Sequence, residues 1–198
     1  MSVVPIVHDD NSKFAYDIYS RLLKDRIIWL DDEINHYTSR LICAQILYLQ
    51  AEGEQLDDKD RAIHLYINSG GGSVVDGLAI YDIIKYIKCP VYTYCVGIAA
   101  SMAATLLAAG EKGHRYAFEN AEVMIHQVLA GISYDQASQI EKRAEHIVKL
   151  KHKMNLILSK LTGQKLSKIV KYTDSDYFMS DEEELNYGIV DKIISSKK

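Results

Sequence analysis

A serine, a histidine and two aspartates lie where secondary-structure elements are predicted to begin or end. Ser101 precedes an apolar helix, and His126 follows the apolar stretch Val123-Met124-Ile125. Asp174 and Asp176 lie in a polar segment between two short predicted helices. These are the residue types of a serine-hydrolase triad, in which histidine takes the proton of the serine hydroxyl and a carboxylate orients the histidine. The sequence therefore predicts nucleophilic hydrolysis.

Each of these residues also has an ordinary structural interpretation. Ser101 is suited to cap the helix that it precedes, because a serine hydroxyl accepts hydrogen bonds from the free amides of a helix N-terminus. A histidine at a strand end is often a core residue with satisfied hydrogen bonds. Aspartates between helices are typical of loops and caps. The residue types alone do not choose between Asp174 and Asp176.

A glycine run follows one predicted strand and precedes a helix, in Ile67-Asn68-Ser69-Gly70-Gly71-Gly72. Glycine permits positive φ, so successive amides can turn toward an anion. The run lacks the G-K-[ST] of a nucleotide-binding P-loop and the complete G-x-G-x-x-G of a dinucleotide site. A plain turn is the alternative. A candidate nucleophile at a neighbouring strand end favours an oxyanion hole.

Composition indicates a single soluble domain. The chain has 198 residues, is 48% hydrophobic and carries a formal charge of −4, which gives no electrostatic reason to expect a nucleic-acid partner. Three cysteines in apolar runs are expected to be reduced thiols. The N-terminal residues lack the basic region of a secretory signal, so a cytoplasmic location is expected. The longest apolar stretch, Cys95–Ala109, is shorter than the roughly 20 residues of a membrane span and is predicted to be a buried helix.

Hydrophobic periodicity predicts alternating strands and helices, which is typical of parallel βαβ units. Possible capping boxes at Ser73–Asp76 and Ser133–Gln136 mark two helix starts. Residues 1–20 are expected to form a flexible arm ahead of one domain over 21–198. Strands are predicted at 26–30, 62–68, 91–96, 114–118, 121–126 and 189–194, and helices over 41–53, 73–88, 101–109, 134–161, 165–172 and 180–188.

Three motifs, in this order along the chain, resemble those of the proteolytic subunit of the Clp protease. They are Tyr66-Ile67-Asn68-Ser69-x-Gly71-Gly72, Gly97-x-Ala99-Ala100-Ser101-Met102-Ala103 and Met124-Ile125-His126-Gln127. The likeness continues through residues 17–23 and 187–191 and covers nearly the whole chain.

The resemblance implies an ATP-dependent serine endopeptidase with an α/β, crotonase-like fold and a protruding helical handle, here 134–161. It assigns the nucleophile to Ser101 and the general base to His126. The family's third member precedes an x-Phe-x-Ser segment, which selects Asp176. The amides of the oxyanion hole fall on Gly72 and Met102.

The resemblance also implies an assembly. Two stacked seven-membered rings would enclose the active sites, and an AAA+ unfoldase would consume ATP and feed in unfolded polypeptides. No cofactor or metal is expected in this chain, and no nucleic acid or membrane partner. Tyr66, Tyr86, Tyr94 and Tyr116 match or lie near the apolar clefts where the family binds its unfoldase, with core packing as the alternative for each.

Some residues depart from the family pattern. Gly70 replaces the usual proline of the Ser-Pro-Gly-Gly turn, and Val128 and Ala130 replace residues of the family's His-Gln-Pro-Leu-Gly-Gly. The altered segment 127–136 predicts a divergent paralogue that depends on a partner ring. Two alternatives are an inactive ring subunit that only recruits the unfoldase, and a crotonase-type acyl-CoA hydratase or isomerase.

Overall fold

The central sheet is built from strands in which every second residue is apolar. The computed structural model describes residues 4–8, 15–131 and 134–195. In it, β4 (Ile63–Ser69) buries Ile63, Leu65 and Ile67 completely. The residues between them face the other way and are partly exposed. Successive side chains of a strand point to opposite faces, so this pattern requires a sheet that is covered by helices on one face.

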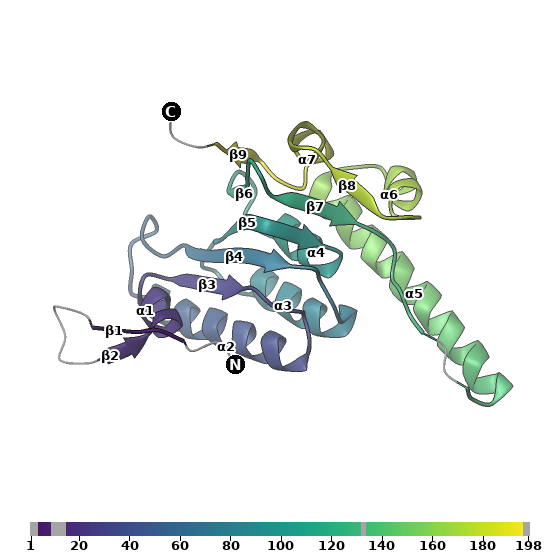
Figure 1. Cartoon of the computed structure of the whole chain (residues 1–198), viewed down its shortest axis with the longest axis horizontal. Coiled ribbons are helices and arrows are strands. Elements are labelled where there is room, and N and C mark those ends of the chain that lie inside the picture. The colour runs from purple at the N-terminus through teal and green to yellow at the C-terminus, as the bar shows by residue number, and fades with distance from the viewer. Residues whose placement is uncertain (1–3, 9–14, 132–133, 196–198) are drawn as a thin grey trace.

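Helices and strands alternate along the chain as predicted, and Figure 1 shows their arrangement. The strands are β1 (Ile6–His8), β2 (Ala15–Asp17), β3 (Ile27–Leu30), β4, β5 (Val91–Ala100), β6 (Arg115–Phe118), β7 (Glu122–Ile125), β8 (Tyr177–Met179) and β9 (Lys192–Ile194). The helices are α1 (Ile18–Lys24), α2 (His36–Gly53), α3 (Val74–Tyr86), α4 (Met102–Ala108), α5 (Ala137–Thr162), α6 (Leu166–Tyr172) and α7 (Asp181–Tyr187).

Most strands of the sheet are parallel. Strands β3, β4, β5, β6 and β9 lie in this order, each parallel to its neighbour. β5 is long enough to have two partners beyond β4, because Thr93–Cys95 pairs with β6 and Ile98–Ala100 pairs with β7. β8 then joins β7 in the antiparallel direction. The predicted α/β fold class with parallel βαβ units is therefore confirmed.

Helices α2, α3 and α4 cover one face of the sheet. They leave the other face uncovered, and this uncovered face is turned toward the viewer in Figure 1. Ile46, Ile80 and Leu106, one from each helix, are completely buried in the core that these helices form with the strands. Burying one such side chain contributes about 1.5–3 kcal/mol relative to leaving it exposed. α5 extends away from this core as a long arm (Figure 1), in agreement with the predicted handle.

Two predicted helices are wrong in their extent. The stretch Cys95–Ala109 is not one helix, because β5 continues to Ala100 and only Met102–Ala108 is helical. Strand pairing on both sides of β5 overrides the helical preference of its alanines. The handle begins at Ala137 rather than at 134, after an extended Gln136 that makes no side-chain cap. Ser133 of the expected capping box lies outside the described residues.

The N-terminal region and one short strand also differ from the sequence prediction. β1 pairs with β2, and α1 begins at Ile18, so the domain boundary expected after residue 20 falls inside a helix. The flexibility of the 1–20 arm stays a prediction. β8 was missed, because three residues among loop-forming neighbours give no periodic pattern.

Helix α7 holds β8 in place. The capping box of Ser180 and Glu183 begins the helix, and Gly188 ends it, both as predicted. Glu183 also accepts a hydrogen bond from the hydroxyl of Tyr177, at 2.9 Å. Tyr177 is the first residue of β8, so the start of α7 fixes the position of the segment that precedes this strand.

The next residue of α7 is a buried carboxyl group. Glu184 is 1% exposed, and neither of its carboxyl oxygens has a hydrogen-bond partner among the described residues. Burial, with a smaller contribution from Asp181, raises the pKa of Glu184 to about 8. The group is therefore protonated in the folded protein at neutral pH and ionised in the unfolded chain.

This difference predicts that Glu184 makes the fold less stable as pH rises. Between about pH 4.5 and pH 8 the folded state holds a proton that the unfolded state has lost, so the free energy of unfolding falls by at most about 1.4 kcal/mol per pH unit from this group. Glu184→Gln should remove this contribution. Urea unfolding at several pH values in this window tests it, with the exposed neighbour substitution Glu182→Gln as the control. Equal pH dependence in wild type and Glu184→Gln would contradict the expectation.

Candidate active site

The candidate residues follow the carboxyl ends of three parallel strands, which meet at one edge of the sheet. The glycine loop follows β4, Ser101 follows β5, and His126 follows β7. The amide of Ser101 donates to the carbonyl oxygen of Met124 at 2.9 Å, which extends the β5–β7 pairing to the candidate nucleophile. Ligands and chemistry are typically found at this edge of an open parallel sheet.

Strand register brings the carboxylate to the histidine. Ile125 of β7 lies opposite Tyr177 of the antiparallel strand β8. The residue after Ile125 is His126, and the residue before Tyr177 is Asp176, so the two come together beside the end of the strand pair. The short strand that was missed in the sequence is therefore the element that positions Asp176.

Ser101, His126 and Asp176 form a continuous chain of polar contacts. The Oγ of Ser101 lies 2.7 Å from Nε2 of His126, and Nδ1 of His126 lies 3.3 Å from Oδ1 of Asp176. With the serine as donor, Nε2 accepts and Nδ1 carries the proton that faces the carboxylate. The His126 side chain is 13% exposed and that of Asp176 is 62% exposed, so water screens the carboxylate more than the imidazole.

The residue types alone did not show whether Asp174 or Asp176 lies beside the histidine, and the structure distinguishes between them. Asp174 lies next to Gln127, whose Nε2 donates to the carbonyl oxygen of Asp174 at 2.8 Å. Its carboxylate is thus beside the glutamine side chain, 3.4 Å from the same Nε2, and Asp176 is the carboxylate beside His126.

The backbone of Ser101 is strained. Its φ of 57° and ψ of −121° are unusual for a residue with a side chain, and Arg26 is the other non-glycine residue with positive φ in the described part of the chain. Ser101 makes no side-chain cap of α4. The capping interpretation is therefore wrong. The hydroxyl instead contacts His126. Strained residues of this kind are concentrated at active sites.

The glycine loop packs directly on this strained turn. A Cβ on Gly71 would lie 2.8 Å from Cβ of Ser101 and 3.0 Å from the amide nitrogen of Met102, so no larger residue fits. The loop is held by Ile34, whose amide donates to the carbonyl oxygen of Gly71 and whose carbonyl accepts from Ser73. Gly70, in contrast, has open space around its Cβ position.

Two amides near the hydroxyl are free to bind an anion. Met102 is the first residue of α4, and the amide of such a residue has no acceptor within its own helix. The amide of Gly72 donates to no protein group among the described residues. Their use as an oxyanion hole stays a prediction.

A small cavity lies beside the hydroxyl and the imidazole. Its volume is about 20 Å³, and its walls include Val74, Val128, Met154 and Leu158. This volume holds about one water molecule and no substrate side chain. Among the described residues, no group of three or more His, Cys, Asp or Glu side chains is arranged to hold a metal ion.

Comparison with known protein families identifies the scaffold that carries this site. A family model described as Clp protease matches residues 10–197, nearly the whole chain. The chain belongs to the Clp protease family.

Three of the four tyrosines singled out from the sequence of this Clp protease family member lie in one stacked row. Ring centroids are 4.5 Å apart between Tyr66 and Tyr94 and 5.0 Å apart between Tyr94 and Tyr116. Trp29 extends the row at 5.2 Å from Tyr66. Tyr86 does not belong to it: it ends α3, on the helical side of the sheet, and is 80% exposed.

The row lies on the sheet face that helices α2, α3 and α4 leave uncovered. Burial among the neighbouring rings raises the pKa of Tyr94 to about 12, and its hydroxyl lies 2.9 Å from Nδ1 of His64. The aromatic positions of Trp29 and His64 were missed in the sequence. Alternation of aromatic and apolar residues in adjacent strands could have revealed them.

The strain at Ser101 predicts an order of stability among substitutions. A side chain at positive φ costs about 1–2 kcal/mol, which glycine avoids, while glycine loses about 0.5–1 kcal/mol more backbone entropy. Ser101→Gly should therefore be more stable than Ser101→Ala by about 0.5–1 kcal/mol in urea unfolding. At Ser159, inside α5, the order should reverse. A more stable alanine variant at position 101 would mean that the turn is not strained.

Proposed function

We propose that the chain is the proteolytic subunit of an ATP-dependent Clp protease, a serine endopeptidase that degrades unfolded polypeptides. The observation that carries the proposal is the 2.7 Å contact between Oγ of Ser101 and Nε2 of His126 at the end of parallel strands. Membership of the Clp protease family supports the same reaction class.

In the proposed mechanism, His126 takes the hydroxyl proton while Oγ of Ser101 attacks the carbonyl carbon of a peptide bond. The amides of Gly72 and Met102 stabilise the negative charge that develops on the carbonyl oxygen. The C–N bond then breaks as His126 returns the proton to the leaving amine. Water, deprotonated by the same histidine, hydrolyses the acyl-enzyme and restores the hydroxyl. Asp176 holds the proton on Nδ1 and so keeps Nε2 available.

The proposed partner is an AAA+ unfoldase that binds the aromatic face formed by Trp29, Tyr66, Tyr94 and Tyr116. An aromatic surface of this kind is favoured at protein interfaces, because large rigid rings bury much area at low entropic cost. The unfoldase, and not this chain, would consume ATP. A cytoplasmic location stays part of the proposal. Separately, the described part of the chain contains no helix with the length and hydropathy of a membrane span.

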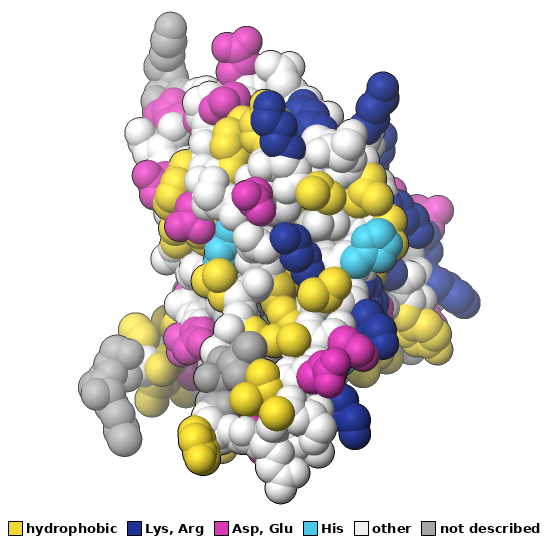
Figure 2. Space-filling view, turned by 90° about the vertical axis from the view of Figure 1, so that its right-hand side faces the viewer, with side chains coloured by type: hydrophobic (Ala, Val, Ile, Leu, Met, Phe, Trp, Pro, Cys, Tyr) yellow, Lys and Arg dark blue, Asp and Glu magenta, His cyan; other side chains and the backbone are white. Residues whose placement is uncertain are grey.

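A second candidate, dependence on a partner ring, is favoured by the charge of the handle. α5 carries six Lys or Arg and two Glu, a net charge of +4 with its histidines neutral, although the whole chain carries −4. Arg143, paired with Asp135 at 2.8 Å, is the one basic residue of α5 that takes part in a described ion pair. Figure 2 looks at the side where α5 lies and shows Lys and Arg side chains toward its right. Two such handles meeting in stacked rings would repel each other.

The small cavity beside Ser101 agrees with this candidate. If this cavity of about 20 Å³ receives the side chain next to the scissile bond, residues such as Val128 and Met154 must move to widen it. Val128 belongs to the altered 127–136 segment. Binding of a partner ring whose handles carry more negative charge than α5 would favour that movement.

The catalytic assignment predicts which substitutions abolish activity. A fluorophosphonate probe should label the wild-type serine and fail to label Ser101→Ala. Asp176→Asn should lower peptide cleavage by about 10²- to 10⁴-fold, because the histidine loses its orienting carboxylate. Asp174→Asn, beside Gln127, should leave the rate largely unchanged. Labelling that persists in Ser101→Ala would refute the assignment.

The charge of the handle predicts that salt promotes stacking of the homomeric protein. Light scattering after gel filtration should show more double rings at about 1 M salt than at about 0.1 M, because screening shortens the range of the repulsion. Lys142→Glu with Lys149→Glu, seven residues apart on one side of α5, should raise double rings at low salt. Lys112→Glu with Lys192→Glu is the matched control. Complete stacking at low salt in the wild type would contradict repulsion between handles.

A further inference from the structure

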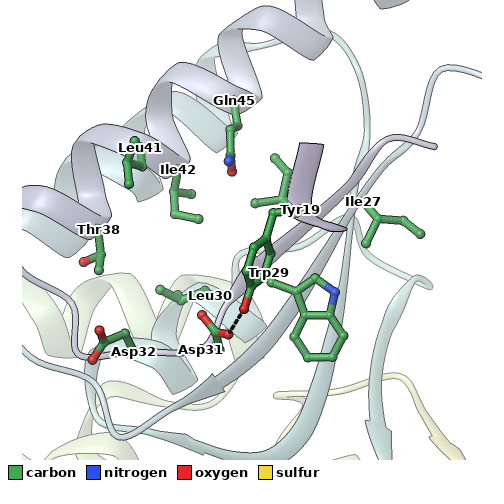
Figure 3. A pocket seen from close by; sticks show the side chains of 11 residues that line it. Tyr19, Ile27, Trp29, Leu30, Asp31, Asp32, Thr38, Leu41, Ile42 and Gln45 are labelled. Carbon is green, nitrogen blue, oxygen red and sulfur yellow. Dashed lines mark hydrogen bonds between the residues drawn. The ribbon is translucent and has the colours of Figure 1, made fainter. Parts of the chain in front are cut away.

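A cavity of about 280 Å³ lies away from the Ser101 site, between α1, β3 and α2. Figure 3 shows its walls: Tyr19 from α1, Ile27 and Trp29 from β3, and Leu41 and Gln45 from α2. Residues 31–32, which follow β3, line part of the cavity and are exposed to solvent. Its volume is close to the lower limit for ligand sites in proteins, which is about 300 Å³.

The charged groups that line this cavity are the carboxylates of Asp31 and Asp32, which only accept hydrogen bonds when ionised. Asp31 takes one bond, from the Tyr19 hydroxyl at 3.0 Å, which raises the pKa of Tyr19. One carboxylate oxygen of Asp32 accepts a hydrogen bond from the backbone amide of Glu33. Neither aspartate takes part in an ion pair with another described residue, and the cavity has no Lys, Arg or His in its walls.

Gln45 adds an unpartnered acceptor on the opposite wall. Its Oε1 is buried and has no hydrogen-bond partner in the described part of the chain. Figure 3 shows this side chain reaching from α2 toward Tyr19. A buried carbonyl oxygen without a donor costs about 1–3 kcal/mol, which a ligand with an N–H group would recover.

The cavity also lies along an open edge of the sheet. β3 is the terminal strand, and the amide of His64 donates to the carbonyl oxygen of Arg26. In a parallel ladder alternate residues bond the same neighbour, so Ile27 and Trp29 present their N–H and C=O groups to the free edge. Such an edge can accept an added strand from another polypeptide.

We propose that this cavity binds the side chain of an arginine or lysine in a polypeptide that lies along the open edge of β3. The aliphatic stem would pack on Tyr19, Leu41 and Ile42, and the cationic head would take Asp31, Asp32 and the oxygen of Gln45 as acceptors. Long basic side chains combine these two properties, and a guanidinium also stacks on an aromatic ring. The backbone of the polypeptide would use the free groups of Ile27 and Trp29.

The only tryptophan of the chain is Trp29, so intrinsic fluorescence reports on this cavity. The probe is the blocked tripeptide Val-Arg-Val, with Val-citrulline-Val as its neutral isostere, added to the Ser101→Ala protein so that neither is cleaved. The arginine peptide should change the emission of Trp29 saturably and bind at least about tenfold more tightly than the citrulline peptide. Equal binding of the two peptides would overturn the cationic assignment.

Two variants identify the groups responsible. Asp31→Asn should weaken binding of the arginine peptide by about fivefold, and Gln45→Leu should also weaken its binding. Circular dichroism should confirm that both variants are folded. Glu145→Gln, which removes one negative charge from α5, is the matched control and should bind as the parent does. Unchanged affinity in Asp31→Asn and Gln45→Leu would contradict the site.

Two further measurements distinguish the occupant. Butylguanidinium alone should bind more weakly than the tripeptide, because it cannot use the strand edge; equal affinity would refute the role of the polypeptide backbone. Emission that changes with protein concentration and not with added peptide would show that a second copy of the chain covers the cavity, which would overturn the proposal.

Discussion

The pairing of β5 with β7 is the constraint on which the site depends. β5 runs along β4 on one side and, in its last three residues, along β7 on the other. That pairing carries Ser101 to the edge of the sheet and bonds its amide to Met124. Because β8 pairs in turn with β7, one set of strand registers positions Ser101, His126 and Asp176.

A bulge in β5 makes this arrangement possible. Ile67 lies opposite Cys95, yet Ser69 lies opposite Ala99, so β5 has two more residues than β4 in this interval. Asn68 accepts the amide of Ile98 at 3.3 Å across the bulge. Bulges bend a strand and redirect its end, and they are frequent next to active sites. Here the bend delivers the strained turn at Ser101 against the glycine loop.

The sequence predicted the scaffold better than the contacts that surround the candidate site. Periodicity identified the strands and helices of the core because each must bury one apolar face, as Ile63, Leu65 and Ile67 do. Ser101 and His126 were singled out because they lie at the ends of such elements, and the structure places them in contact. The order of motifs, and not physical reasoning, selected Asp176, since its position depends on a three-residue strand whose pairing is non-local.

Features that depend on contacts between distant parts of the chain could not be predicted from the sequence. The buried carboxyl of Glu184 lies in a segment that looks like an ordinary exposed acidic helix, and only its packing shows that it lacks a partner. The small cavity beside Ser101 depends on the approach of Met154 from the handle, 53 residues further along the chain. The row of aromatic rings requires the register of four strands.

The central claim is that strand pairing aligns Ser101, His126 and Asp176 within a single subunit, and that a partner only opens the adjacent cavity. Pre-steady-state acylation by a small activated ester, which needs no side-chain pocket, tests this most directly on the purified chain without partners. The account predicts a rapid burst of the released alcohol equal to the concentration of subunits, followed by slow turnover. Absence of a burst from folded protein would contradict the claim, because the triad would then not be aligned without help.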